Sequence, residues 1–188
     1  PEHQQLAPFA HVSRQVAERA LDEHSRASKA AVISYALLEL EETAFADRGL
    51  PPLERIVMVA CGTAAYSGMV AKYAIEHWTR IPVEVALAHE FRYSDPIADE
   101  RTLVVSISQS GETMDTIMAI RHAREQGSKV LAIVNTYGST SARESDAVLY
   151  THAGPEVAVA STKAFIAQIA ACYLLGLYLA ELRGNKYQ

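Results

Sequence analysis

The sequence predicts a three-layer α/β/α domain on a five-stranded parallel sheet, preceded by a helical segment. The first observation is a set of five short runs rich in Val and Ile, at residues 55–60, 83–87, 102–107, 129–134 and 147–150. These runs lack polar alternation, which is typical of strands covered on both faces. The second observation is a set of longer helical patterns, at residues 64–78, 112–126 and 161–182. Strands that alternate with helices favour a parallel sheet, and we expect shorter connections after the second and fourth strands.

Residues 1–50 are expected to form a separate N-terminal helical extension. Residues 12–46 contain no Gly or Pro and are rich in Ala, Glu, Arg and Leu, which are good helix formers. Gly49, Pro51 and Pro52 then end the helical pattern. The sequence therefore predicts two units, the extension at 1–50 and the α/β domain at 51–188.

The composition excludes several classes of protein. The 188-residue chain carries 17 Lys and Arg against 22 Asp and Glu, a net charge of -5, which argues against sequence-independent binding of nucleic acid. Two cysteines, Cys61 and Cys172, are too few for a fold held by disulfides and fit a reducing compartment. We therefore expect a cytoplasmic protein without a nucleic-acid partner.

One uncharged segment, residues 164–180, has to be considered as a membrane span. It is slightly shorter than the ~18–20 residues that a spanning helix needs. Gln168 and Gly176 interrupt its apolar character, and Glu181 follows it directly. We predict a helix buried inside the domain, and no membrane partner.

Hydroxyl groups gather where the third predicted strand leads into a helix. Open parallel sheets bind ligands beyond the carboxyl ends of their strands. Residues 106–113 place four hydroxyls in eight positions at such an end, without Lys or Arg, and Gly111 lets the backbone approach a ligand closely. Helix N-termini attract anions through unpaired N–H groups. This loop is predicted to bind a phosphate through neutral donors; the alternative is that Ser108 or Ser110 only caps the helix.

Motifs for cofactors, metals and nucleophilic catalysis are absent from the sequence. Gly62 and Gly68 do not have the spacing of a dinucleotide or P-loop motif, and Ser110 lacks the upstream Gly of a nucleophile elbow. The seven histidines contain no i, i+4 pair, and the two cysteines form no zinc pattern. We expect neither a cofactor nor a metal.

Six strings in the sequence carry a resemblance to a known family: ACGT, HEFRY, SISQSGET, LAIVN, RESDAVLYTHAGPE and VASTKAF. Over residues 55–187 the chain resembles the first sugar-isomerase (SIS) subdomain of the glucosamine-6-phosphate synthase family, the isomerizing glutamine–fructose-6-phosphate aminotransferases. The resemblance implies the flavodoxin-like strand order 2-1-3-4-5. The strand order would then reverse between strands one and three, next to the hydroxyl-rich loop.

The resemblance also implies a set of substrate-binding residues. Those in the loop at 108–113 would hold the phosphate of fructose 6-phosphate or glucosamine 6-phosphate, those at 61–63 would line the sugar, and two more would contact the sugar from the last loop. The residues are Cys61, Gly62, Thr63, Ser108, Gln109, Ser110, Thr113, Val159 and Ser161. Ala64 stands where the family often has Ser, which removes one hydroxyl contact.

The family's glutaminase and the catalytic second half of its isomerase are not matched by this sequence. The chain is therefore interpreted as the sugar-phosphate-binding subdomain of the isomerase part, inactive alone and without a catalytic residue of its own. Two alternatives stay open: a stand-alone regulatory SIS module, and a flavin mononucleotide carrier that stacks the flavin on Trp78 or Tyr93. We expect a homodimer, because association covers the apolar surface of a lone subdomain.

Overall fold

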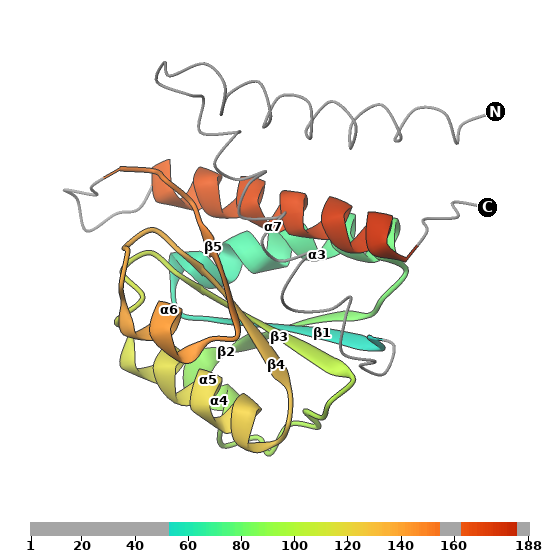
Figure 1. Cartoon of the computed structure of the whole chain (residues 1–188), viewed down its shortest axis with the longest axis horizontal. Helices are drawn as coiled ribbons and strands as arrows, with labels where there is room; N and C mark the ends of the chain where they lie inside the picture. Colours follow the sequence, from blue (N-terminus) through green and yellow to red (C-terminus); the bar gives the residue numbers. More distant parts are fainter. Residues whose placement is uncertain (1–52, 155–162, 184–188) are drawn as a thin grey trace.

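The computed structural model describes residues 53–154 and 163–183. Its centre is a five-stranded parallel sheet in the order β2-β1-β3-β4-β5 (Figure 1). The strands are β1 (Arg55–Ala60), β2 (Val83–Leu87), β3 (Thr102–Ser108), β4 (Lys129–Val134) and β5 (Ala147–Tyr150). The predicted strands and their predicted order are confirmed. The order reverses between β1 and β3, whose register pairs Ala60 with Ile107.

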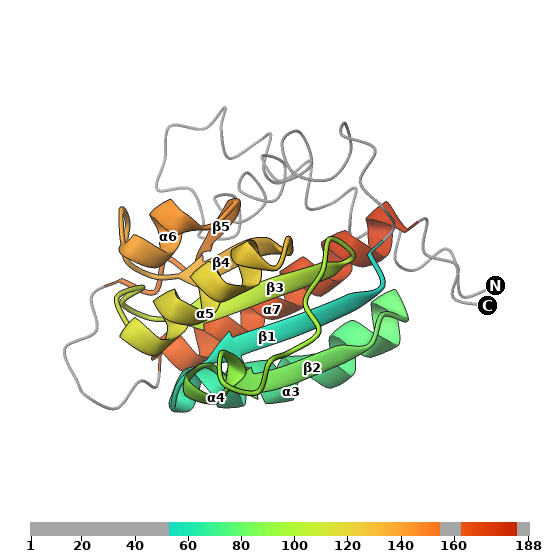
Figure 2. The same cartoon turned by 90° about the horizontal axis from the view of Figure 1, so that it is seen from below.

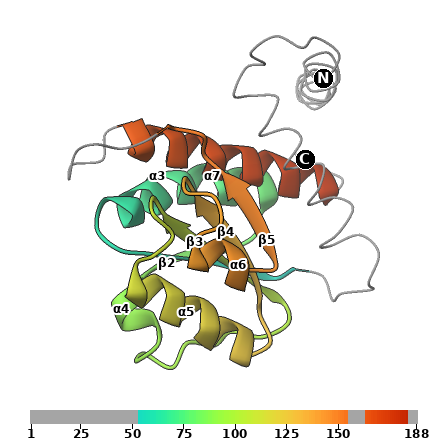
Figure 3. The ribbon, with the colours of Figure 1, turned by 60° about the vertical axis from the view of Figure 1, so that its left-hand side comes forward.

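Helices cover both faces of this sheet. One face carries α3 (Thr63–Thr79) and α7 (Lys163–Leu182), and the other carries α4 (Ala88–Phe91), α5 (Met114–Glu125) and α6 (Thr140–Glu144) (Figures 2 and 3). The short α4 and α6 follow β2 and β4, where the sequence predicts shorter connections. The architecture is the predicted three-layer α/β/α fold.

Apolar side chains of the central strands pack on both faces of the sheet. On β1, Ile56 and Met58 belong to the core shared with α3 and α7, whereas Val57 and Val59 belong to the core shared with α4 and α5. All four side chains are fully buried. Successive strand residues point to opposite faces, so on a strand covered on both sides each of these four positions faces an apolar core. This double coverage explains the unbroken apolar run of β1.

The long helix α7 packs along α3 (Figure 1). Among the described helices, α7 is long and apolar enough to cross a membrane by length and composition, over Lys163–Ala180, yet half of this window is buried inside the domain. Gly176 brings the α7 backbone close to α3, where an added Cβ would lie 2.8 Å from Ile75 Cγ1 and 3.1 Å from Trp78 Cε3. Such contact is expected of a core helix.

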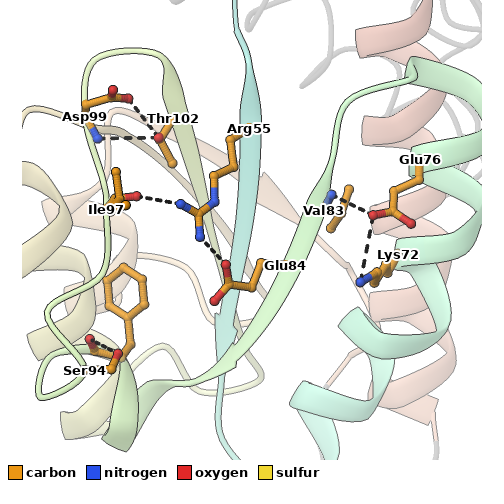
Figure 4. Close-up of polar contacts among 10 residues, drawn as sticks. Arg55, Lys72, Glu76, Val83, Glu84, Ser94, Ile97, Asp99 and Thr102 are labelled. Carbon is orange, nitrogen blue, oxygen red and sulfur yellow. Dashed lines mark hydrogen bonds and ion pairs between the residues drawn. The ribbon is translucent and has the colours of Figure 1, made fainter.

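Ion pairs and hydrogen bonds of charged side chains connect the elements at the amino-terminal edge of the sheet (Figure 4). Arg55, at the start of β1, pairs with Glu84 of β2 and donates a hydrogen bond of 3.0 Å to the carbonyl of Ile97. The Val83 N–H, at the start of β2, donates over 2.9 Å to the carboxylate of Glu76 on α3. These contacts hold the edge opposite to the one where the sequence predicts a ligand.

The helix after β3 begins later than the sequence predicts. Periodicity places its start at residue 112, whereas α5 begins at Met114. Gly111 has a φ of 68°, outside the right-handed helical region, and the N-cap residue Thr113 is extended, with ψ 114°. The junction is therefore a longer loop than expected. The predicted helical extension at 1–50 lies outside the described residues.

Candidate functional site

A cavity of about 230 Å³ opens where the strand order reverses. It lies at the ends of β1 and β3, beside the first turns of α3 and α5. The described residues that line it are all uncharged: Cys61, Thr63, Ala64, Ile107, Ser108, Gln109, Ser110, Thr113, Thr116 and Gln168. Open parallel sheets bind their ligands at this position.

The loop between β3 and α5 is shaped by its own side chains. Ser108 Oγ accepts the N–H of Gly111 over 3.0 Å, and Ser110 Oγ accepts the N–H of Glu112 over 3.1 Å. Thr113 Oγ1 lies 3.4 Å from Ser108 Oγ. A hydroxyl oxygen that accepts a backbone proton keeps its own proton to donate. The loop therefore presents hydroxyl donors to the cavity.

Gly111 closes this loop against the segment before α6. A Cβ on Gly111 would lie 2.2 Å from Ser139 Oγ and 2.6 Å from Ser139 Cβ. The Gly111 carbonyl accepts the N–H of Ser141 over 2.9 Å. The sequence predicts a Gly here for the approach of a ligand; the close approach in the structure is that of Ser139. The glycine thus shapes the loop through its close contact with Ser139 and not through contact with a ligand.

The one carboxylate in the loop at 106–113 is engaged outside the cavity. Glu112 Oε1 accepts the backbone N–H of Thr140, at the start of α6, over 2.7 Å. Hydrogen bonding from Thr140 lowers the pKa of Glu112 below its ordinary value. α5 begins without a side-chain cap at Thr113, so the N–H groups of its first turn stay open. An anion in the cavity would meet hydroxyls and N–H groups at the positive end of a helix.

The two cysteines lie in different surroundings. Cys61 follows β1 at the cavity, partly exposed, with its Sγ 3.9 Å from Thr116 Oγ1. Cys172 is buried in the core that α3 and α7 share, and this burial raises the pKa of its thiol to about 12. The Cys172 thiol therefore stays protonated near neutral pH, and of the two only Cys61 can contact a ligand.

The structure brings together six of the nine predicted substrate-binding residues: Cys61, Thr63, Ser108, Gln109, Ser110 and Thr113. Gly62 is the N-cap of α3 and does not line the cavity, and Val159 and Ser161 lie outside the described residues. Sequence reasoning missed two polar lining residues. Thr116 lies three positions after Thr113 on α5, a spacing that keeps both on one helix face. Gln168 is the one amide in the apolar stretch at 164–180.

The two aromatic residues of the flavin alternative do not line the cavity. Trp78 lies near the end of α3 and packs edge-on against Tyr173, with ring centres 5.5 Å apart. Tyr93 is exposed and carries the Arg92 guanidinium over its ring. Within the described residues, the cavity therefore offers no aromatic surface for a flavin ring. The same residues contain no group of three or more His, Cys, Asp and Glu that could hold a metal ion.

Comparison with known proteins places this site in a family. The family model of the SIS domain matches residues 51–178, which include every described lining residue of the cavity. The isomerizing glutamine–fructose-6-phosphate aminotransferase of Corynebacterium efficiens is 70% identical over 150 residues, and that of Streptomyces coelicolor is 69% identical over 150 residues. Each match covers 80% of this chain and 24% of the relative. The chain thus spans about a quarter of the length of these relatives.

Solved structures agree with this assignment. The C-terminal domain of glucosamine-fructose-6-phosphate aminotransferase from Francisella tularensis aligns with a TM-score of 0.69 and 36% identity, over 92% of this chain and 46% of that one. Glucosamine-6-phosphate deaminase from Thermotoga maritima aligns with a TM-score of 0.63 over 97% of this chain and 50% of that one; at 18% identity it supports the fold alone. The chain is homologous to the isomerase part of the aminotransferases, and it belongs to the SIS domain family.

Proposed function

We propose that this chain is the sugar-phosphate-binding subdomain of the isomerase part of a glutamine–fructose-6-phosphate aminotransferase. The observation that carries the proposal is the uncharged cavity at the end of β3, which combines hydroxyl donors with the uncapped N-terminus of α5. Its ligand would be fructose 6-phosphate or glucosamine 6-phosphate. The loop at 108–113 would hold the phosphate, and Cys61 and Thr63, together with Val159 and Ser161, would face the sugar.

The expected affinity follows from the neutral character of these donors. A hydrogen bond to a charged group contributes about 1.5–3 kcal/mol. About four to six such bonds, less the cost of association, correspond to a Kd roughly between micromolar and millimolar. In the isomerization, a phosphate fixed in this way would position the carbon chain for proton transfer between neighbouring carbons. The described part of the chain would supply the positioning.

Single hydroxyl deletions test the phosphate loop. Ser110→Ala and Thr113→Ala should each weaken fructose 6-phosphate binding by about 1–3 kcal/mol, because each removes a donor to a charged oxygen. Isothermal titration calorimetry on the 188-residue chain measures the change. Ser94→Ala is the matched control, since Ser94 donates its hydroxyl to Phe91 and does not line the cavity. Unchanged affinity in both loop variants would place the phosphate elsewhere.

We also propose a homodimer that forms through one face of α3. Four large side chains at i, i+3, i+4 and i+7 spacing are exposed on this face, namely Tyr66, Met69, Val70 and Tyr73. They line a groove of about 600 Å³. A contiguous apolar surface marks an interaction site, and a two-fold axis lets two copies cover the same face of each other.

Sedimentation of the chain tests this dimer. The wild-type chain should sediment as a dimer at about 50 µM, and Tyr73→Glu should make it monomeric, because a charge inside an apolar interface is costly to bury. Tyr93→Glu is the control: Tyr93 is 80% exposed, comparable to Tyr73 at 73%, but it lies outside the α3 face. A monomeric wild-type chain contradicts the proposed dimer.

The localisation proposed here is the cytoplasm. Half of the apolar window of α7 is buried inside the domain, and the helix packs along α3, which supports a protein free of the membrane. Cys61 and Cys172 are both free thiols, which fits a reducing compartment.

A further inference from the structure

One buried polar side chain at the cavity has no hydrogen-bond partner among the described residues. Gln168 of α7 is only 2% exposed, and no hydrogen bond reaches its amide from any described residue. Burying an amide without a partner destabilises a fold, and buried polar side chains are normally hydrogen-bonded. Thr79, equally buried on α3, shows the usual case, since its hydroxyl donates to the Ile75 carbonyl over 2.7 Å. The exposed part of Gln168 faces the cavity, where a ligand can supply the missing partner.

Gln168 reaches the cavity from the side opposite to the loop at 108–113, which is proposed to hold the phosphate. α7 lies with α3 on one face of the sheet, and α5, which begins at the end of that loop, lies on the other (Figure 3). The cavity is therefore bounded by Ser108, Ser110 and Thr113 on the α5 side and by Gln168 on the α7 side. A phosphate ester held by the loop would extend its carbon chain across the cavity toward the amide.

The chemistry of the amide suits hydroxyl groups rather than the phosphate. A glutamine amide offers two donors and one acceptor oxygen and carries no charge. It can donate to one sugar hydroxyl and accept from the next. A Leu or Met at this position would complete the apolar surface of α7, so packing alone gives no reason for an amide.

We propose that Gln168 is a sugar-contacting residue, whose amide pairs with hydroxyl groups on the carbon chain of the bound sugar phosphate. This inference rests on the proposed function of the site and assigns the part of the ligand that discriminates a sugar phosphate from phosphate alone. In the free chain the amide has no hydrogen-bond partner among the described residues, and in the complex the ligand supplies one.

Gln168→Met separates this role from a structural one. Met has similar length and no amide, so we expect fructose 6-phosphate affinity to fall about 5- to 10-fold, the loss of one or two neutral hydrogen bonds. Inorganic phosphate, measured by calorimetry on the same variant, should keep its affinity. The melting temperature of the free variant should equal or exceed that of the wild type, because the substitution breaks no hydrogen bond to a described residue and Met suits the apolar surface of α7. A structural glutamine would instead lower the melting temperature and both affinities.

Gln168→Asn guards against a failure of the Met variant to fold. Asn keeps the polarity but withdraws the amide by one methylene, so sugar-phosphate affinity should fall while phosphate affinity stays. If the wild-type chain binds fructose 6-phosphate and both variants bind it equally well, the inference about Gln168 is wrong and the proposed function stands. If the wild-type chain binds neither fructose 6-phosphate nor inorganic phosphate, the proposed function and the inference fall together.

Discussion

Gly111→Ala is expected to destabilise the domain by about 2–5 kcal/mol, the sum of about 1–2 kcal/mol for a left-handed backbone and about 1–3 kcal/mol for overpacking. The φ of 68° disfavours any side chain, and the new Cβ would lie 2.2 Å from Ser139 Oγ. Relief of this clash has to move the loop that carries Ser110 and Thr113, so fructose 6-phosphate binding should be lost as well. Urea unfolding followed by circular dichroism measures the stability, and calorimetry measures the binding.

Two further variants isolate the clash. Gly138 has a similar φ of 66°, but a Cβ there would meet nothing within 4 Å, so Gly138→Ala should show only the backbone cost. Ser139→Gly removes the two nearest atoms that the new Cβ would meet and leaves Val134 Cγ1 at 3.3 Å, so in the Gly111→Ala background it should restore much of the lost stability. Equal losses in Gly111→Ala and Gly138→Ala would mean that Ser139 does not constrain the loop.

Gly176→Leu is expected to destabilise the domain by about 3 kcal/mol through overpacking between α7 and α3. Even the first atom of the new side chain would lie 2.8 Å from Ile75 Cγ1 and 3.1 Å from Trp78 Cε3. The leucine therefore has to force the two helices apart. Because α7 also carries Gln168, binding of fructose 6-phosphate should weaken in the same variant. Thermal and urea unfolding measure the stability.

Gly68→Ala is the matched control on α3. Gly68 is also a buried helical glycine, but its nearest neighbour would be Ile107 Cδ1 at 3.4 Å, an ordinary contact. Alanine is favoured over glycine inside a helix by about 1 kcal/mol, so this variant should be more stable than the wild type. A neutral Gly176→Leu would show that α7 does not pack on α3 as described.

The strands could be predicted from the sequence because helices cover both faces of the sheet and bury almost every position of the central strands β1, β3 and β4. Residues 56–59 alternate between two cores, so each needs an apolar side chain, and the pattern reports the fold directly. The same reasoning predicted a ligand site at the end of β3, where the structure has a cavity lined by Ser108, Ser110 and Thr113. Parallel topology then brought Cys61 and Thr63 to the same cavity.

The shape of the loop could not be predicted, because its partners come from far along the chain. Glu112 binds Thr140, 28 residues away, and Gly111 meets Ser139; no local pattern around residue 112 records either contact. Both contacts lie just before the start of α5 at Met114. Gln168 was not predicted as a lining residue for a different reason. Because α7 is apolar on nearly every side, periodicity does not indicate which of its residues faces the cavity.

Neutral lining gives the cavity a distinctive response to its surroundings. Coulombic attraction between exposed ions falls with the Debye length, about 8 Å at physiological ionic strength. The described lining contains no Lys or Arg. A phosphate dianion bound there through hydroxyl and amide groups would depend little on long-range Coulombic attraction. Salt would therefore weaken the binding of the proposed ligand only a little. A neutral site of this kind would suit a metabolite that is bound weakly and released quickly.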